Sequence, residues 1–356
     1  LRSLGNKVES GTRLSLDDGR RLFASDDLLG IGRLADHVRR KRHRDRTTFV
    51  VNRQINPTNI CSLSCRFCCF SVKDGAPGAY VLGIRDILSR LSPDLREVHI
   101  VGGLYEGWDF EDYLNIVREV HRAAPAVSIK AYTAVEIDFF ARREKTTAGE
   151  ILRRLKEAGV VCLPGGGAEV FSERVRKILF PRKIGRDRWL DIHRTAHRMG
   201  LRSNATLLYG HIETVEERLD HLMKLRSLQD DTGGFLSFIP LPFQPGDSGL
   251  VDRPASAMDD LKTVAVSRLL LDNFDHIKSY WVAVGEDLCS VALHFGADDV
   301  DGTIREERVM HAARARTPEG LTRDRIVRLV REAGFVPVER DGLYRNRREV
   351  RGGRSA

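Results

Sequence analysis

The sequence lacks the features of a secreted, membrane-spanning or low-complexity protein. It has only six cysteines among 356 residues and no signal-like apolar run at its start, which argues against a disulfide-stabilised secreted domain. No stretch approaches the roughly 18 consecutive apolar residues that cross a bilayer. Internal repeats and long low-complexity linkers are missing as well. With 42% hydrophobic residues, the composition is that of a globular enzyme, which we expect to be cytoplasmic and without a membrane partner.

The net charge of +8 is concentrated at the two ends of the chain. Residues 1–46 carry +5 and residues 340–356 carry +4, which leaves −1 for residues 47–339. The basic run at residues 39–44 follows a helix-like stretch, 26–38, and is interpreted most simply as a solvated helix face. No aromatic or groove-reading element accompanies this charge, so we expect no nucleic-acid partner. An anionic small substrate remains compatible with it.

Strand-like and helix-like segments alternate from about residue 48 onward. This alternation predicts an α/β fold with a parallel sheet and crossover helices. Roughly eight units in about 260 residues fit a (β/α)8 TIM-type barrel, although an incomplete barrel or an open doubly wound sheet would give the same pattern up to the sixth strand. The expected strands are 48–52, 98–101, 128–133, 160–163, 203–208, 235–240, 277–282 and 297–302, and the clearest helices are 109–124, 148–158, 186–199, 215–229 and 258–273.

We expect three segments along the chain: an N-terminal helical extension (1–47), the barrel (48–311) and a C-terminal extension (312–356). The last segment contains one helix, 322–333, and a short strand-and-turn tail. The Pro/Gly-rich stretch 240–254 is expected to be a long loop after the sixth strand. In such barrels the active site lies in the loops that follow the strands, so motifs at those positions are the candidates for function.

Three cysteines lie within eight residues, directly after the first expected strand. Cys61, Cys65 and Cys68 have the spacing C-x3-C-x2-C. The pattern offers three thiolates to one centre and no fourth, which suits a [4Fe–4S] cluster with one open iron. The alternative is a zinc site closed by a histidine from elsewhere in the chain. The other cysteines are expected to be packed thiols: Cys69, Cys162 and Cys289.

Glycines and acidic residues follow other expected strands. Gly102 and Gly103, after the second strand, would let the backbone approach a ligand closely, although paired glycines are also common in ordinary turns. Gly166 and Glu169 follow the fourth strand at the start of a helix. They would suit a bound ribose or amino-acid group, or Glu169 would simply favour the helix dipole.

A G-x-x-E motif, Gly210 to Glu213, follows the fifth strand, where the glutamate would bind backbone around a nucleoside or cap the next helix. The order of these motifs along the chain resembles that of the radical S-adenosylmethionine (SAM) superfamily. The resemblance implies that Cys61, Cys65 and Cys68 bind a [4Fe–4S] cluster, whose fourth iron takes the methionine group of SAM. It further implies that the glycines and acids after the strands contact SAM: Gly102, Gly103, Gly166, Glu169, Gly210 and Glu213.

Longer segments narrow the resemblance to the aminofutalosine synthases of menaquinone biosynthesis, over roughly residues 48–340. Segments 130–137 and 295–303 distinguish this family best from its relatives. The resemblance implies a transferase that adds the 5′-deoxyadenosyl radical of SAM to the dicarboxylate enol ether 3-[(1-carboxyvinyl)oxy]benzoate, giving 6-amino-6-deoxyfutalosine. The alternative is a related enzyme, such as dehypoxanthine futalosine cyclase, whose radical abstracts hydrogen. A flavodoxin- or ferredoxin-type electron donor is also implied.

A dicarboxylate substrate needs cationic or hydroxyl partners at the strand ends. Arg53 on the first strand is one candidate, with a structural ion pair as the alternative interpretation. Thr133 and His211 are candidates at the rim, and Glu136 would bind the SAM amine, act on substrate or cap a helix. One departure concerns Tyr105, which stands where the family usually has a histidine that would contact substrate.

Overall fold

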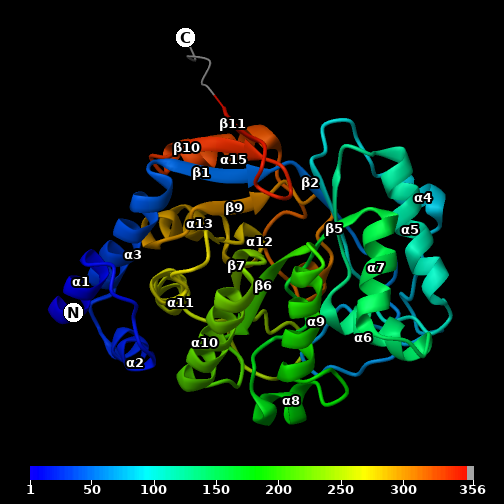
Figure 1. The fold of residues 1–356 in the computed structure, drawn as a ribbon, viewed down its shortest axis with the longest axis horizontal. Helices are drawn as coiled ribbons and strands as arrows, with labels where there is room; N and C mark the ends of the chain where they lie inside the picture. Colours follow the sequence, from blue (N-terminus) through cyan, green and yellow to red (C-terminus); the bar gives the residue numbers. More distant parts are fainter. Residues whose placement is uncertain (351–356) are drawn as a thin grey trace.

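Seven parallel strands curl around the centre of the molecule in the order β2-β3-β4-β5-β6-β7-β8 (Figure 1). The computed structural model describes residues 1–350; residues 351–356, the end of the expected C-terminal extension, lie outside the described part. Because the spatial order of the strands equals their chain order, each crossover places the next strand beside the last. The strands are β2 (Asn52–Ile55), β3 (Glu97–Ile100), β4 (Ser128–Ala131), β5 (Val160–Leu163), β6 (Arg202–Tyr209), β7 (Phe235–Pro242) and β8 (His276–Ile277).

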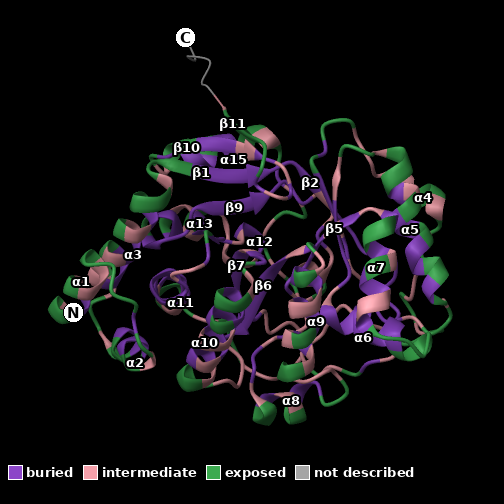
Figure 2. Ribbon diagram, viewed as in Figure 1, coloured by how far each residue is buried: buried purple, intermediate pink, exposed green. Residues whose placement is uncertain are grey.

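Helices surround this sheet, with exposed residues on their outer faces (Figures 1 and 2). α7 is typical: the Thr147 hydroxyl accepts a hydrogen bond from the Glu150 N–H at its start, and it ends at Gly159 with φ of 115°. None of the helices in residues 1–350 has the length and apolarity to cross a membrane. The helices are α4 (Ile84–Leu88), α5 (Phe110–Ala123), α6 (Ala134–Arg143), α7 (Ala148–Ala158), α8 (Glu173–Leu179), α9 (Arg186–Arg198), α10 (Val215–Thr232), α11 (Ala257–Leu270), α12 (Trp281–Val284) and α13 (Glu286–Ala292), followed by the short 3-10 turn η1 (Leu293–Phe295).

An eighth parallel strand, β9 (Asp299–Gly302), closes the barrel. It pairs with β1 (Arg46–Val50), which continues into β2 with only Val51 between them. On its other side β9 reaches β8 through a single parallel bridge, Lys278 to Asp299. The predicted TIM-type barrel is therefore confirmed, and its seam is held by short pairings instead of a continuous ladder.

Most expected strands and helices are confirmed to within a few residues, and two strands need correction. The segment 48–52 is two strands, because β1 and β2 belong to different sheets. The predicted strand 277–282 is wrong beyond Ile277, where β8 ends and the chain soon turns into α12. Trp281, within the predicted strand, is instead a buried helical residue whose indole N–H donates to the Gly302 carbonyl at 2.9 Å.

A second sheet joins β1 to the C-terminal strands, with the order β11-β10-β1-β9. The strands of this sheet come from all three expected segments of the chain. The segment boundaries at residues 47 and 311 therefore stay a prediction. The remaining elements are α1 (Arg2–Glu9), α2 (Leu16–Ala24) and α3 (Leu28–His43) before the barrel, and α14 (Val309–Ala312), α15 (Arg323–Glu332), β10 (Val336–Arg340) and β11 (Arg347–Glu349) after β9.

The basic run at the end of α3 is the solvated helix face that we expected at Arg40, Lys41 and Arg44, which are exposed, but not at Arg39. Arg39 is fully buried and donates to the Arg46 carbonyl and the Thr47 hydroxyl, both at 2.8 Å. Arg42 donates to the Phe274 carbonyl at 2.8 Å. These arginines fasten α3 to the barrel by satisfying loop carbonyls, a role that the charge pattern alone does not reveal.

Asp299, on the edge strand β9, links three parts of the second sheet through its side chain. Its carboxylate lies 2.6 Å from Arg340 Nε and accepts hydrogen bonds from the Tyr344 hydroxyl at 2.9 Å and the Thr48 hydroxyl at 2.7 Å. Burial alone would raise the pKa of Asp299, but Arg340 and the surrounding cations and donors outweigh it and lower the pKa to about 2.

Replacing this carboxylate, Asp299→Asn, should lower the free energy of unfolding by about 3–5 kcal/mol, because it leaves Arg340 buried without its counter-charge. Denaturant unfolding followed by circular dichroism measures the change. Because the pKa of Asp299 is lowered on folding, the ionised carboxylate stabilises the wild-type protein at neutral pH. This stabilisation should be lost as pH falls from about 4 toward 2. The matched control is Asp187→Asn, in an exposed pair with Arg186, which should change stability by less than about 1 kcal/mol.

Candidate functional site

The loop between β2 and α4 carries the cysteines across the carboxyl end of the barrel. Cys61, Cys65 and Cys68 are half-buried free thiols that line one cavity at this end, which we call the upper cavity. Burial raises the pKa of Cys65 to about 11, partly opposed by nearby Lys183. Three thiols around one cavity are a donor set for a metal cluster that accepts thiolates, since metal binding displaces their protons.

The cysteines do not form the tight cluster that a single zinc ion needs. In residues 1–350, only His43, His276 and Asp298 place three ligand atoms of His, Cys, Asp or Glu within 4.8 Å of one another. In a mononuclear tetrahedral zinc site each sulfur lies about 2.3 Å from the metal, so the sulfur atoms lie closer to one another than this 4.8 Å limit. The wider spacing of the three thiols fits a cluster that spreads its ligands over different irons.

Gly102 and Gly103 are required by the cysteine loop itself. A Cβ atom on Gly103 would lie 2.0 Å from the Ile60 carbonyl oxygen, and one on Gly102 would lie 2.9 Å from the Thr58 oxygen. The Gly103 N–H donates to that Thr58 oxygen at 2.9 Å. Both glycines also line the upper cavity. The paired glycines therefore let two backbone segments touch and set the position of the first cysteine.

Glu136 lies at the same rim, buried at the start of α6. Its carboxylate accepts hydrogen bonds from the Gly102 N–H at 3.1 Å, and from the Thr133 N–H at 2.6 Å and hydroxyl at 2.8 Å. Burial raises the pKa of Glu136 to about 7, against the opposing effect of these donors. Glu136 thus caps α6 and ties it to the glycine turn while it borders the cavity.

Glu169 borders the upper cavity and forms an ion pair with Lys183, a residue that we did not predict. Lys183 lies 5.0 Å from the centre of the Phe67 ring, within the cysteine loop, and its pKa is raised because Glu169 and the cysteines outweigh its burial. Nothing in the local sequence at 181–185 marks this lysine, because its partners come from two other loops. Lys183 brings positive charge to a site that must hold thiolates.

The G-x-x-E motif folds onto itself beside the site. Glu213 accepts hydrogen bonds from the Gly210 N–H at 2.6 Å and the His211 N–H at 2.9 Å, and pairs with Arg218 Nε at 2.8 Å. His211 is buried, with Nε2 3.1 Å from the Leu208 carbonyl. Neither Gly210 nor the His211 and Glu213 side chains line the cavities described here. The structure therefore places this motif as a support of the turn after β6.

Polar residues line the inside of the barrel below the cysteines, forming a lower chamber. Along β2 and β3 the inward positions are Asn52, Gln54, Glu97 and His99, and apolar residues such as Val98 face the helices. The expected candidate Arg53 therefore points outward, where it donates to the Arg90 carbonyl at 2.8 Å and lies 3.4 Å from Glu306. We correct its placement: the structure does not bring Arg53 to the chamber.

Two unpredicted groups in the lower chamber have incomplete partners. The Nε2 atom of His99 is buried with no hydrogen-bond partner among the described residues. Burial and the charge of Lys130 lower the pKa of His99 to about 4, so the ring is neutral at physiological pH. Lys278 Nζ lies 3.4 Å from Asp301 Oδ1, whereas Lys130 is held more closely by Glu97, at 2.8 Å. The parity of β3 shows that His99 faces the interior, but not which groups lie opposite it, and Lys278 lies just beyond the end of β8.

Tyr105, the departure from the expected histidine, lies outside both cavities. Its ring packs edge-on against Trp108, with centroids 5.7 Å apart, and its N–H donates to the Tyr113 hydroxyl at 2.9 Å. Tyrosine at this position is thus accommodated by packing against Trp108 and Tyr113.

The variant Gly103→Ala should displace the cysteine loop, because the new methyl group meets a backbone carbonyl that cannot turn aside. We expect a loss of about 1–3 kcal/mol in unfolding free energy and a reduced iron-to-protein ratio after anaerobic reconstitution. Gly149→Ala is the control: its Cβ would meet nothing closer than 3.7 Å in α7. Normal iron loading in Gly103→Ala would contradict this role.

Comparisons with known proteins agree with this geometry. Residues 55–225 match the radical SAM superfamily and residues 232–352 match the CofH/MqnC C-terminal region. The chain is 45% identical to the aminodeoxyfutalosine synthase of Thermus thermophilus, over 96% of this chain and 94% of that protein. It is 42% identical to the aminodeoxyfutalosine synthase of Streptomyces coelicolor, over 99% and 95% of the two chains.

A differently named enzyme, the 5-amino-6-(D-ribitylamino)uracil–L-tyrosine 4-hydroxyphenyl transferase of Archaeoglobus fulgidus, is 36% identical over 91% of this chain and 96% of its own. Among solved structures, methylornithine synthase shares the fold, with a TM-score of 0.75 at 20% identity over 94% and 97% of the two chains. The chain therefore belongs to the radical SAM superfamily and is an enzyme that uses a [4Fe–4S] cluster and SAM.

Proposed function

We propose that this enzyme is an aminofutalosine synthase, which adds the 5′-deoxyadenosyl radical from SAM to the vinyl carbon of 3-[(1-carboxyvinyl)oxy]benzoate. Methionine leaves when SAM is cleaved, the aryl group of the adduct migrates, and carbon dioxide or bicarbonate leaves to give 6-amino-6-deoxyfutalosine. The observation that carries the proposal is a cysteine-lined upper cavity above a chamber that contains incompletely partnered cationic and polar groups. The names of the relatives in Thermus and Streptomyces support the same reaction.

In this proposal the upper cavity holds the cluster and SAM. Cys61, Cys65 and Cys68 are the cluster ligands, and the bound cluster and SAM supply the 5′-deoxyadenosyl radical. Gly102 and Gly103 keep the floor of the cavity thin, so that backbone lies directly against the ligand. Glu169, with Lys183 behind it, and Glu136 place carboxylates where the SAM amine and ribose would need acceptors.

The lower chamber suits an aromatic acid. Apolar side chains form part of its walls and would pack against the aromatic ring, while its polar side chains would bind the carboxylates. We propose that Lys278 receives a substrate carboxylate, since an ammonium has three donors and Asp301 lies at only one side of it. Neutral His99 adds a second polar contact without adding charge. The apolar walls include Val101, Ile239, Leu241, Ile304, Val309 and Met310.

The two spaces join at shared residues, which would aim the radical carbon at the alkene. Val101, Thr133 and Leu241 line both, as do Val309 and Met310 of α14. Glu307 accepts the N–H groups of Val309 and Met310 at 2.9 Å and so fixes the start of this helix over the opening. A mostly apolar junction excludes water and other hydrogen donors from the path between the two ligands.

Product analysis tests the proposal directly. Anaerobically reconstituted enzyme, reduced with dithionite and given SAM and the enol ether, should yield one product whose mass contains the adenosyl group. The adduct is expected because radical addition keeps the adenosyl carbon bonded to substrate. Free 5′-deoxyadenosine as the sole nucleoside product would contradict it and favour hydrogen abstraction, as in the futalosine cyclase alternative.

The variant Lys278→Met should lower kcat/KM for the enol ether by about 10- to 100-fold, because a hydrogen bond to a charged group is worth about 1.5–3 kcal/mol. Iron content and SAM affinity should stay at wild-type levels, since Lys278 lies in the lower chamber. The control Lys224→Met removes a half-exposed lysine of α10 that lies 3.6 Å from Asp220. Unchanged kcat/KM in Lys278→Met, or in a His99→Phe companion, would remove the corresponding residue from the substrate site.

A further inference from the structure

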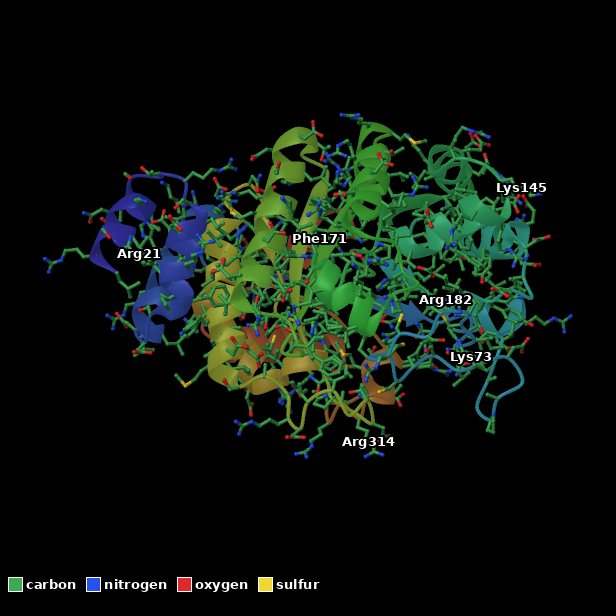
Figure 3. All side chains as sticks on the ribbon, turned by 90° about the horizontal axis from the view of Figure 1, so that it is seen from below. Arg21, Lys73, Lys145, Phe171, Arg182 and Arg314 are labelled. Atoms are coloured by element: carbon green, nitrogen blue, oxygen red, sulfur yellow. The ribbon has the colours of Figure 1, made fainter. Side chains whose placement is uncertain are left out.

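The outer side of the cysteine loop carries a basic hollow at the molecular surface. It is lined by the loop residues Ser62 and Leu63, by Leu104 and Glu106 after β3, by Phe139, and by three arginines, Arg142, Arg143 and Arg182. Lys73 lies beside it, as Figure 3 shows for Lys73 and Arg182, and both donate to the same Ser62 carbonyl, at 3.4 and 3.2 Å.

The hollow is separated from the upper cavity by a single layer of side chains. Leu63 and Leu104 line both spaces. Lys73 also donates to the carbonyl of Cys61, a proposed cluster ligand, at 3.0 Å. Of the surface hollows described, this one therefore reaches the proposed cluster from outside without crossing the substrate chamber.

The lining of the hollow has three arginines and one acidic residue, Glu106, so its net charge is positive. Among the described residues no carboxylate lies within 4.0 Å of the Lys73, Arg143 or Arg182 cations, which contact backbone carbonyls instead. Backbone carbonyls satisfy hydrogen bonds but carry no net charge. Arg142 is the exception, 2.9 Å from Asp138. Exposed cations held in place without counter-ions form a patch that attracts an acidic partner.

A second arginine-rich hollow provides the contrast. It lies between α5 and α7 and is lined by four arginines, yet each of them has a carboxylate partner. For example, Arg118 pairs with Glu111 at 2.8 Å and Arg153 with Glu157 at 2.5 Å. Both hollows are therefore rich in arginine. The basic hollow differs because three cations in or beside it have no carboxylate partner within residues 1–350 and because it lies behind the cysteines. The four are Arg118, Arg122, Arg153 and Arg154.

We propose that the basic hollow docks an acidic, low-potential electron carrier of the flavodoxin type. The carrier hydroquinone gives up one electron and becomes the semiquinone, and the cluster changes from the 2+ to the 1+ state. The inference rests on the proposed function in requiring a cluster bound by the three cysteines. It adds the place where the electron enters and the charge of the protein that delivers it.

The test is the double charge reversal Arg142→Glu/Arg143→Glu in the reconstituted holoenzyme, with a purified acidic flavodoxin as the probe. The polar partners of the two arginines lie outside the cysteine loop, since Arg143 donates to the Glu106 carbonyl and Arg142 pairs with Asp138. Flavodoxin binding is measured by biolayer interferometry at about 50 and about 300 mM salt. Electron transfer is measured by the bleaching of cluster absorbance after mixing with flavodoxin hydroquinone. We expect the affinity and the bleaching rate at low salt to fall by about 10-fold or more, and salt to weaken wild-type binding.

The control variant Arg118→Glu/Arg122→Glu makes the same change in net charge at the second hollow. It should retain flavodoxin affinity, and both variants should retain dithionite-driven turnover. Unchanged affinity in Arg142→Glu/Arg143→Glu, or an equal loss in the control variant, would overturn the docking surface. If dithionite gives no adenosyl product, the proposed function fails, whereas the binding measurement still decides the docking surface.

Discussion

The contact between the turn after β3 and the cysteine loop is the constraint on which the site depends. Gly103 brings two backbone segments closer than any side chain would permit, and its N–H fixes the loop at Thr58. Glu136 then holds the same turn from the opposite side by accepting the Gly102 N–H. Loop, turn and helix thus form one hydrogen-bonded unit, which explains how a long loop can present three thiols to one cavity.

Buried charged pairs occur in both parts of the proposed active site. Lys183 and Glu169 lie with the cysteines, whereas Lys278 and Asp301 lie inside the barrel. In a low-dielectric interior such groups persist only when they are paired or when a ligand completes them. The polar inner face of β2 and β3 is costly for stability, and a barrel that served only as a scaffold would be filled with branched apolar residues. The polar interior therefore supports the proposed placement of the substrate inside the barrel.

The sequence predicted what depends on local spacing and failed where partners are distant. The three cysteines, the glycine turn and most helices follow from short patterns, and the structure confirms the barrel they imply. Arg53 was chosen for its charge, but it alternates with the inward residues Asn52 and Gln54 and so faces away. His99 and Lys278 were missed because their roles follow from which strands face each other across the barrel, a property that no single segment contains.

The seam between β1 and β9 has a consequence for how the protein matures. Thr48 pairs with Asp299, so residues from opposite ends of the chain must meet before the wall of the site is complete. Such distant pairings slow folding, because the loop entropy must be lost before the contact forms. During synthesis the cysteine loop emerges early, but the chamber beneath it stays open until the last strands arrive. The cysteine thiols are therefore present in the growing chain before the strands that complete the lower chamber.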